Sequence, residues 1–450
     1  MINNLNFKKQ QILELVKEYI SEKRATESWT AGEDWLSYSG PVFDENEYVA
    51  AIDNLLDEWL IFGKKAREFE LLFPKFMGKK VGSLTNSGSS ANLLAVTAVK
   101  SKFNLKDGDK FITPVVCFPT TINPLIQCNF EVVFVDVTLP DLNLDLDEVE
   151  RICENDPSIK GIMFAHVLGN PPDMDRLMAL VSKYELIFIE DACDALGSFY
   201  DGKKLGSFGE ISTCSFFPAH HMTLGEGGFI ATDSGSLRKK VTSFRDWGRA
   251  CYCNTGMPGN VTCATACGNR FQSWLSDLPD FTYDHRYVFE EIGYNLKPLE
   301  MQAAIGLEQL KKLPMLDEAR RSNFSKLCEV FEPYGDYFHL PEATDKADPN
   351  WFAFLLTIKQ DAPFTRHDLV SCLESAKIQT RSYFSGNIMY HPGYRHMRQG
   401  YGDLKERFPK AHLVTTNSFF LGTFAGITSD KIQYIGATIS GFFDELRAKT

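Results

Sequence analysis

The 450-residue sequence lacks several features that would mark whole classes of protein. Acidic residues outnumber basic ones by 59 to 47, and a net charge of −12 gives no support for nucleic-acid binding. No apolar run approaches the ~20 residues of a membrane-spanning helix. The N-terminus has no basic region followed by an apolar one, as a secretion signal would. We therefore expect a cytoplasmic protein that binds neither nucleic acid nor membranes.

The sequence also lacks lysine at one particular place. None occurs between Lys204 and Lys239, although residues 215–228 have the layout of the lysine loop of pyridoxal phosphate (PLP) enzymes, S-F-x-x-x-K-x-x-x-x-G-E-G-G. The lysine position holds His220. A lysine there forms a Schiff base with the cofactor aldehyde and also moves protons, whereas imidazole can do only the second. The substitution argues against ordinary transamination.

The 11 cysteines are unevenly distributed. Cys251, Cys253, Cys263 and Cys267 fall in one short segment. In a reducing compartment such a group is more often a metal site than a disulfide framework. Six others lie in apolar or helical contexts and are expected to be small buried side chains: Cys117, Cys128, Cys153, Cys214, Cys328 and Cys372.

Alternating strands and helices dominate the chain from about Gly82. This alternation predicts an α/β domain with a mostly parallel sheet between helices. The predicted strands are residues 110–116, 131–137, 161–166, 186–190, 211–216, 229–232 and 351–358. The predicted helices are residues 7–23, 47–59, 66–76 and 296–313. We divide the chain into an N-terminal helical segment (1–40), a large domain (41–313) with a Cys-rich loop (249–287), and a small C-terminal domain (314–450).

Several short motifs come directly after predicted strands or before predicted helices, and their order along the chain indicates a cofactor site. Residues 87–92 (SGSSAN) precede an apolar helix, where free backbone N–H groups and hydroxyls can hold a phosphate. Phe118 comes after a predicted strand and could cover a cofactor ring. Asp191 stands at the end of another strand, where a carboxylate faces the usual ligand crevice and can pair with a pyridine nitrogen. Each motif taken alone is more simply explained as a helix cap or a core residue. The motifs together, in this order, are specific for a cofactor site.

From about residue 35 to its end, the chain resembles the DegT/DnrJ/EryC1/StrS family of sugar aminotransferases and dehydratases. Within that family, residues 218–221 (PAHH) and 246–253 (DWGRACYC) resemble the CDP-6-deoxy-4-keto-glucose 3-dehydrases. The resemblance implies the α/β fold of the type I PLP-dependent transferases, with a seven-stranded, mostly parallel sheet between helices and a smaller C-terminal α/β domain. It also implies a homodimer that binds pyridoxamine phosphate (PMP) without a covalent lysine link.

The resemblance assigns a role to each candidate residue. His220 would be the base that takes a proton from C4′ of the cofactor, which suits imidazole because it is substantially neutral at pH 7. Phe118 would stack on the cofactor ring, Asp191 would pair with its nitrogen, and Asp194 would lie near its hydroxyl. Asn295 would reach the phosphate site of the partner subunit. The phosphate ligands within the subunit would be Gly88, Ser89, Ser90 and Ser215. His221 is left a space-filling role, and Phe217 stands where a tyrosine is expected.

The resembling 3-dehydrases hold a [2Fe–2S] cluster with four cysteines in the pattern C-x57-C-x-C-x7-C. Cys193, Cys251 and Cys253 reproduce the first two gaps, but Cys263 comes after nine residues and Cys267 after thirteen. We take Cys267 as the fourth ligand because it begins C-G-N-R-F, against C-G-K-R-F in the family, so the loop would carry six extra residues. Thiolates also bind zinc, which remains an alternative.

The predicted activity is removal of the C3 hydroxyl from a nucleotide-linked 4-keto-6-deoxyhexose, by dehydration and then one-electron reductions. The product would be a 3,6-dideoxysugar for a surface polysaccharide such as lipopolysaccharide. An NADH-dependent flavin iron–sulfur reductase would supply the electrons. The resemblance implies CDP as the carrier, and Lys64, Arg249 and Arg381 are candidate contacts to the phosphate or the sugar.

Three alternatives remain open at this point. A cluster-independent 3-dehydratase that recycles PMP with glutamate would also carry histidine for lysine, but it would lack the cysteines. A PLP sugar aminotransferase would need the missing lysine. A catalytically inactive homologue, acting as a sensor or assembly partner, would not be expected to keep Asp191, His220 and the cysteines together.

Overall fold

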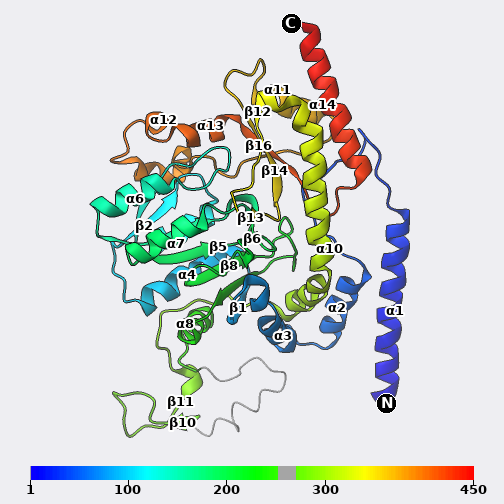
Figure 1. Cartoon of the computed structure of the whole chain (residues 1–450). Helices are drawn as coiled ribbons and strands as arrows, with labels where there is room; N and C mark the ends of the chain where they lie inside the picture. Colours follow the sequence, from blue (N-terminus) through cyan, green and yellow to red (C-terminus); the bar gives the residue numbers. More distant parts are fainter. Residues whose placement is uncertain (1, 252–269, 450) are drawn as a thin grey trace.

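The structure, a computed structural model, describes residues 2–251 and 270–449 (Figure 1). Its central element is a seven-stranded sheet in the order β1-β9-β8-β5-β4-β2-β3. The strands are β1 (Val81–Thr85), β2 (Lys110–Pro114), β3 (Glu131–Val135), β4 (Ile159–Ala165), β5 (Ile187–Asp191), β8 (Ile211–Ser215) and β9 (Gly228–Thr232). β9 alone runs opposite to the other six strands, so the predicted sheet of seven mostly parallel strands is confirmed.

Helices cover both faces of this sheet because its strands are apolar on both sides. One buried cluster joins the sheet to α4 (Gly88–Lys102), α5 (Pro119–Gln127) and α8 (Gly235–Arg245). A second cluster, on the other face, includes side chains of α3 (Lys64–Leu72), α6 (Leu146–Asn155), α7 (Met174–Lys183) and the first half of α10 (Glu300–Phe331). The sheet is therefore the middle layer of three, which is what continuous rather than alternating apolar strands predict.

The C-terminal part forms a smaller lobe around a four-stranded sheet in the order β12-β14-β16-β15. Its strands are β12 (Phe338–His339), β14 (Ala353–Ile358), β15 (Arg381–Ser382) and β16 (Ser418–Gly422). Its helices are α11 (Arg366–Ser375), α12 (Leu404–Arg407), α13 (Pro409–Asn417) and α14 (Ser429–Lys449). A third buried cluster joins this sheet to α11, α14 and the end of α10.

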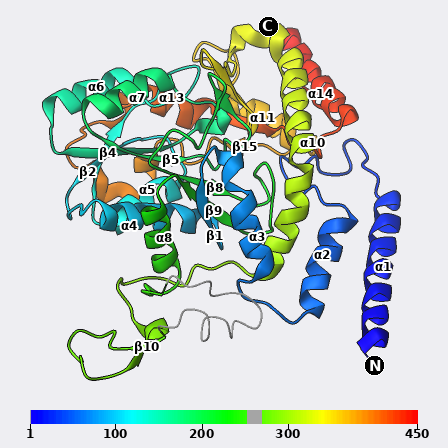
Figure 2. The same ribbon diagram turned by 60° about the horizontal axis from the view of Figure 1, so that its bottom comes forward.

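The helix α10 connects the two lobes and is much longer than predicted. It has 32 residues and continues past Leu313, with Pro314 inside it. Figure 2 shows α10 running from beside α3 up to α14. The predicted division of the chain at residue 313 therefore falls within a continuous helix.

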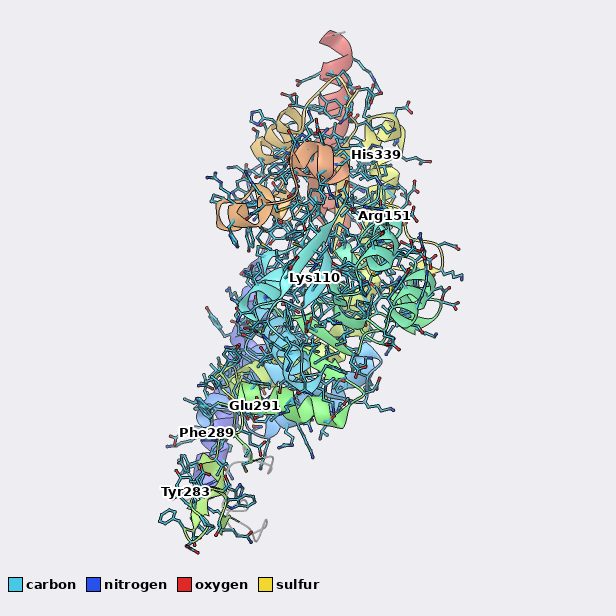
Figure 3. All side chains as sticks on the ribbon, turned by 90° about the vertical axis from the view of Figure 1, so that its left-hand side faces the viewer. Lys110, Arg151, Tyr283, Phe289, Glu291 and His339 are labelled. Atoms are coloured by element: carbon cyan, nitrogen blue, oxygen red, sulfur yellow. The ribbon has the colours of Figure 1, made fainter. Side chains whose placement is uncertain are left out.

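Two parts of the chain lie at the edge of the molecule. The N-terminal helix α1 (Ile2–Thr26) packs beside α2 (Glu45–Leu56) in both ribbon views. The segment with β10 (Phe271–Gln272) and β11 (Tyr283–Asp284) projects from the end of the molecule opposite His339 (Figure 3). Within the described ranges, no helix has the length and apolarity needed to cross a membrane.

The remaining short strands form a small sheet of their own beside the large one. They are β6 (Phe199–Tyr200), β7 (Lys203–Lys204) and β13 (Ala347–Asp348), in the order β13-β6-β7. Because β13 precedes β14 in the chain, this sheet ties the start of the small lobe to the loop after Asp191.

Candidate active site

A cavity of about 460 Å³ opens at the carboxyl ends of the parallel strands. This is the edge of an α/β sheet where ligands usually bind. The large domain contributes Ser87, Gly88, Ser89, Phe118, Thr120, Ala165, Cys193, Asp194, Ser215, Phe217, Ala219, His220 and Glu226 to its lining. The N-terminal segment and the small lobe contribute Tyr38, Phe352, Arg381, Ser382, Phe384 and Phe420. None of these described lining residues is a lysine.

One end of the cavity is a cradle at the N-terminus of α4. Ser87 caps this helix, and its hydroxyl accepts a hydrogen bond from the backbone N–H of Ser90 at 3.1 Å. A Cβ atom on Gly88 would lie 2.5 Å from the Cβ of Ser215, so only glycine leaves the cradle open. Hydroxyls and backbone N–H groups at a helix N-terminus suit a phosphate.

The structure separates the four predicted phosphate ligands into two groups. Gly88, Ser89 and Ser215 line the cavity, as does Ser87, which carried no assigned role. The Ser90 hydroxyl instead accepts a hydrogen bond from the Ser87 hydroxyl at 3.0 Å. Ser90 is not among the lining residues, so its hydroxyl supports the cradle from behind.

Asp191 is buried at the end of β5 and is not itself among the lining residues, although Cys193 and Asp194, which follow it closely in the chain, are. Its carboxylate accepts hydrogen bonds from Asn92 Nδ2 at 2.8 Å, from Thr121 Oγ1 at 2.9 Å and from the backbone N–H of Cys193 at 3.1 Å. These three donors fix the orientation of the carboxylate. The sequence does not mark Asn92 and Thr121 as partners of Asp191, because both are distant from it along the chain and belong to helices, where polar residues carry no special signal.

His220 and its neighbour His221 face different surroundings. The His220 side chain lines the cavity, and its Nδ1 lies 3.3 Å from Asp194 Oδ1. His221 is buried, and its Nε2 donates to the backbone carbonyl of Asn350 at 2.8 Å. Burial lowers the pKa of His221 well below its ordinary value, and the nearby Arg320 guanidinium adds to this effect. Only His220 is therefore placed to act on a bound ligand.

Asp194 also lines the cavity, as expected of a residue near a cofactor ring. Burial raises the pKa of its carboxyl group, and its contact with His220 opposes that rise. The 3.3 Å contact does not have the geometry of a hydrogen bond. A carboxylate oxygen that moved into hydrogen-bond geometry with Nδ1 would favour the tautomer with hydrogen on that nitrogen and leave the lone pair on Nε2.

Aromatic and basic side chains form the remaining walls. Phe118 is half exposed, and its ring centroid lies 5.9 Å from that of Phe384 in the small lobe. The guanidinium of Arg381 lies 4.3 Å from the ring centroid of Tyr38. Of the three basic residues proposed as anion contacts, Arg381 lines the cavity, whereas Lys64 and Arg249 are not among its lining residues.

Of the four predicted cluster ligands, the structure describes two. Cys193 lines the cavity, and burial raises the pKa of its thiol well above the ordinary value. Cys251 is half-buried, and Cys253 and Cys267 lie outside the described residues, as does Cys263. Among residues 2–251 and 270–449, no group of three or more His, Cys, Asp or Glu side chains is arranged to hold a metal ion. Of the two described cysteines, only Cys193 lines the cavity, so a cluster that it held would lie at the cavity wall.

Asn295 is exposed and does not line the cavity of its own subunit. Its side-chain oxygen accepts a hydrogen bond from Lys297 Nζ at 2.7 Å. Burial lowers the pKa of Lys297 to about 8, and its ammonium lies over the Trp247 ring. The position of Asn295 is compatible with a role in the site of a second subunit.

The fold and the cavity define an α/β protein with a site for a phosphorylated, planar ligand and no lysine to anchor it. The chain belongs to the DegT/DnrJ/EryC1/StrS aminotransferase family, whose family model matches residues 42–440. The expected family is thereby confirmed.

Named relatives are similar over almost the whole chain. The chain is 40% identical over 446 residues to the lipopolysaccharide biosynthesis protein RfbH of Salmonella typhimurium, covering 98% of each. It is 40% identical over 438 residues to dTDP-4-dehydro-2,6-dideoxy-D-glucose 3-dehydratase of Saccharopolyspora spinosa, covering 96% of this chain and 92% of the relative. The solved structure of E. coli GDP-4-keto-6-deoxy-D-mannose-3-dehydratase with bound hydrated PLP superposes with a TM-score of 0.75 at 29% identity, covering 90% of this chain and 99% of that one.

Proposed function

We propose that the protein is a PMP-dependent 3-dehydrase of a nucleotide-linked 4-keto-6-deoxyhexose, acting in the cytoplasm. The observation that carries the proposal is the cavity itself, whose lining joins a phosphate cradle to the imidazole of His220 and includes no lysine among the described residues. Asp191 is buried next to this lining, two residues before Cys193. The names of the relatives support it, because two of them are sugar-nucleotide 3-dehydratases.

When bound, PMP supplies an amine for the sugar ketone and a ring that accepts electrons while the C3 hydroxyl leaves. The chain's own residues hold and orient it. Ser87, Gly88, Ser89 and Ser215 bind the phosphate, and the Phe118 ring covers one side of the cavity. Asp191 presents a fixed carboxylate to the ring nitrogen.

His220 moves the proton in this proposal. Asp194 lies beside Nδ1, so Nε2 is the nitrogen that takes the proton at the C4′ position, and imidazole carries it until the next transfer. The surrounding phenylalanine rings, Phe352 and Phe384 among them, limit the access of water to this proton.

The opposite end of the cavity receives the sugar nucleotide. Arg381, one of the lining residues of the small lobe, supplies a guanidinium for an anionic group, and the Tyr38 ring packs against it. The relatives named above use dTDP- and GDP-linked sugars, so CDP stands as one of three candidate carriers. Turnover with the CDP-, dTDP- and GDP-linked 4-keto-6-deoxy sugars, compared at equal concentration, identifies the carrier.

A [2Fe–2S] cluster held by Cys193, Cys251, Cys253 and Cys267 completes the proposal. A cluster would supply two electrons one at a time; these electrons would give the 3-deoxy sugar and leave the cofactor in its amine form, so that no glutamate is needed. An NADH-dependent flavin iron–sulfur reductase delivers them, and the product is a dideoxysugar for a surface polysaccharide. RfbH, a lipopolysaccharide biosynthesis protein by name, supports the last point.

Iron analysis tests the redox part most directly. The anaerobically purified protein should contain about two iron atoms per chain and show a reducible [2Fe–2S] signal by electron paramagnetic resonance. A protein with one zinc and no iron would contradict the redox model. An iron-free protein that turns over with glutamate instead of a reductase would establish the cluster-independent alternative.

A further inference from the structure

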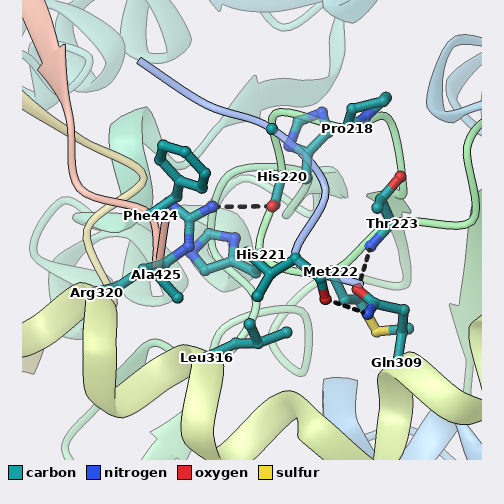
Figure 4. Close-up of a pocket in the computed structure, with 12 residues that line it drawn as sticks. Pro218, His220, His221, Met222, Thr223, Gln309, Leu316, Arg320, Phe424 and Ala425 are labelled. Atoms are coloured by element: carbon teal, nitrogen blue, oxygen red, sulfur yellow. Dashed lines mark hydrogen bonds between the residues drawn. The ribbon is translucent and has the colours of Figure 1, made fainter. Parts of the chain in front are cut away.

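A buried arginine lies directly behind the backbone of His220. Arg320 projects from α10, and its Nη2 donates to the backbone carbonyl of His220 at 2.9 Å and to that of Ala219 at 3.3 Å. Figure 4 shows the guanidinium pointing at the His220 carbonyl. Nothing in the sequence marks Arg320 as close to His220, because 100 residues separate the two.

The other amino group of the Arg320 guanidinium bonds to the backbone of the small lobe. Arg320 Nη1 donates to the backbone carbonyl of Phe352 at 3.0 Å, and it lies 3.5 Å from the hydroxyl of Thr423. The Phe352 ring, in turn, packs against the His220 ring with 5.4 Å between centroids. One side chain thus fixes the backbones that carry both of the touching rings.

The chemistry of arginine suits this arrangement. Arg320 is only 3% exposed, and its hydrogen bonds run to carbonyl and hydroxyl oxygens. Burial lowers the pKa of Arg320 to about 10, so the group is still charged at neutral pH. A planar guanidinium donates in several fixed directions at once, whereas a lysine ammonium is a compact charge on a flexible stem.

The space around Arg320 is filled rather than open. A cavity of about 10 Å³ is bordered by His220, His221 and Arg320 (Figure 4). That volume holds at most one water molecule. Arg320 is therefore part of the packed support under the loop and lies apart from the substrate space.

We propose that Arg320 is a positioning residue that holds His220 at the working distance for proton transfer. It does so by joining the His220 loop of the large domain to the Phe352 backbone of the small lobe. The inference rests on the proposed role of His220 as the base. Beyond that role, the placement of His220 depends on contact between the two lobes, which the Arg320 side chain of α10 provides.

The first test reads the position of His220 in the protein without cofactor. Diethyl pyrocarbonate modifies accessible imidazoles, and mass spectrometry assigns the rate to each histidine. Arg320→Met should raise the rate at His220 several-fold, because its ring is freed from Phe352. Arg321→Met is the matched control, since Arg321 is the next residue of α10 but bonds instead to Asp348 and the carbonyl of Gly197. Equal rates at His220 in both variants would overturn the proposal.

The second test uses the exchange with solvent of the C4′ proton of PMP, measured in the presence of the 4-keto-6-deoxy sugar nucleotide whose ketone the PMP amine takes up. Arg320→Met should slow exchange by about 100-fold, the order expected for a displacement of ~1 Å at a reacting group. In a His220→Asn background the same substitution should have no further effect, because its action passes through His220. An undiminished second effect would show that Arg320 acts in some other way.

Arg320→Lys keeps the charge and serves as a second variant in case Arg320→Met does not fold. It should lose at least ten-fold in exchange while unfolding close to the wild-type temperature; exchange at the wild-type rate would contradict the proposal. If the wild-type protein itself shows no exchange that depends on His220, the proposed function fails. The modification rates, measured without cofactor, still decide whether Arg320 positions the ring.

Discussion

At the scale of single residues, Gly88 leaves the phosphate cradle open because it has no side chain. A Cβ atom there would meet Ser215 at 2.5 Å. Gly88→Ala should therefore weaken PMP binding at least ten-fold, about 1.4 kcal/mol, as measured by fluorescence titration. Gly235→Ala is a matched control, because Gly235 also begins a helix behind a serine cap but a Cβ there meets nothing within 4 Å. Equal PMP affinity in the two variants would contradict the cradle assignment.

The two adjacent histidines allow a second prediction. His220→Asn should still bind PMP, but exchange of the C4′ proton should fall by about 10²–10⁴-fold, the usual contribution of an acid–base group. His221→Asn should keep the exchange and lose about 1–3 kcal/mol of unfolding free energy, because a buried partner of the Asn350 carbonyl is disturbed. Solvent exchange monitored by NMR and chemical denaturation measure the two effects. Exchange that survives in His220→Asn would remove this residue as the base.

The fourth cluster ligand can be decided by single substitutions. Cys267→Ser should abolish the [2Fe–2S] absorbance, because a hydroxyl is a poor substitute for a thiolate ligand. Cys263→Ser should leave the absorbance unchanged. The reverse pattern would assign the fourth position to Cys263, at the shorter of the two spacings.

At the scale of elements, α10 brings charged groups into the region between the lobes. Asp317 on this helix accepts a hydrogen bond from Asn350 Nδ2 at 2.6 Å, and burial raises its pKa to about 6. A raised pKa means that the folded state favours the protonated form. The stabilisation from protonation is complete below the ordinary pKa of 3.8 and is lost as the pH rises through about 6.

Asp317→Asn removes this titration. Relative to the wild type, the variant should gain about 1–3 kcal/mol of unfolding free energy between pH 4 and pH 7, measured by urea denaturation at several pH values. Glu318→Gln, at the exposed neighbouring position, should show no such pH-dependent gain. If the difference in unfolding free energy between Asp317→Asn and the wild type is the same at every pH, burial does not raise the pKa of Asp317 as described.

The elements also show where sequence reasoning succeeds. Strands such as β5 (IFIED) and β14 (AFLLTI) are largely buried, and each begins with a nearly continuous apolar run that gives a clear signal in the sequence. The second half of α10 was not predicted, because a proline inside a helix ordinarily costs ~3 kcal/mol. Pro314 is tolerated since it is exposed and both lobes pack on the helix around it.

For the site, sequence motifs identify residues that stand just after a strand or at the start of a helix. Gly88, Asp191 and His220 all stand at or near such places, and the structure brings them to one edge of the sheet. The residues that support them carry no comparable signal. Asn92 and Arg320 meet their partners across 99 and 100 residues of chain, through contacts that only the folded packing creates.

At the scale of the whole molecule, the proposed dimer makes a prediction about shared sites. If Asn295 serves the partner's phosphate site, a mixed dimer of His220→Asn and Asn295→Ala subunits contains one fully wild-type site. Random pairing of the two inactive variants should restore about a quarter of the wild-type activity. A mixture of His220→Asn with the double variant should restore none. If the first mixture recovers no activity although mass spectrometry shows that mixed dimers have formed, Asn295 does not serve the partner's site.

The described residues that line the cavity include no lysine, and this has a consequence for how the protein is supplied with the proposed cofactor. A ligand held there only by hydrogen bonds, charge and ring contacts is at equilibrium with its free pool. Occupancy therefore depends on the surrounding vitamin B6 concentration, and dilution or dialysis empties the site. By the same mass action, the melting temperature should rise with added ligand and fall back when it is removed.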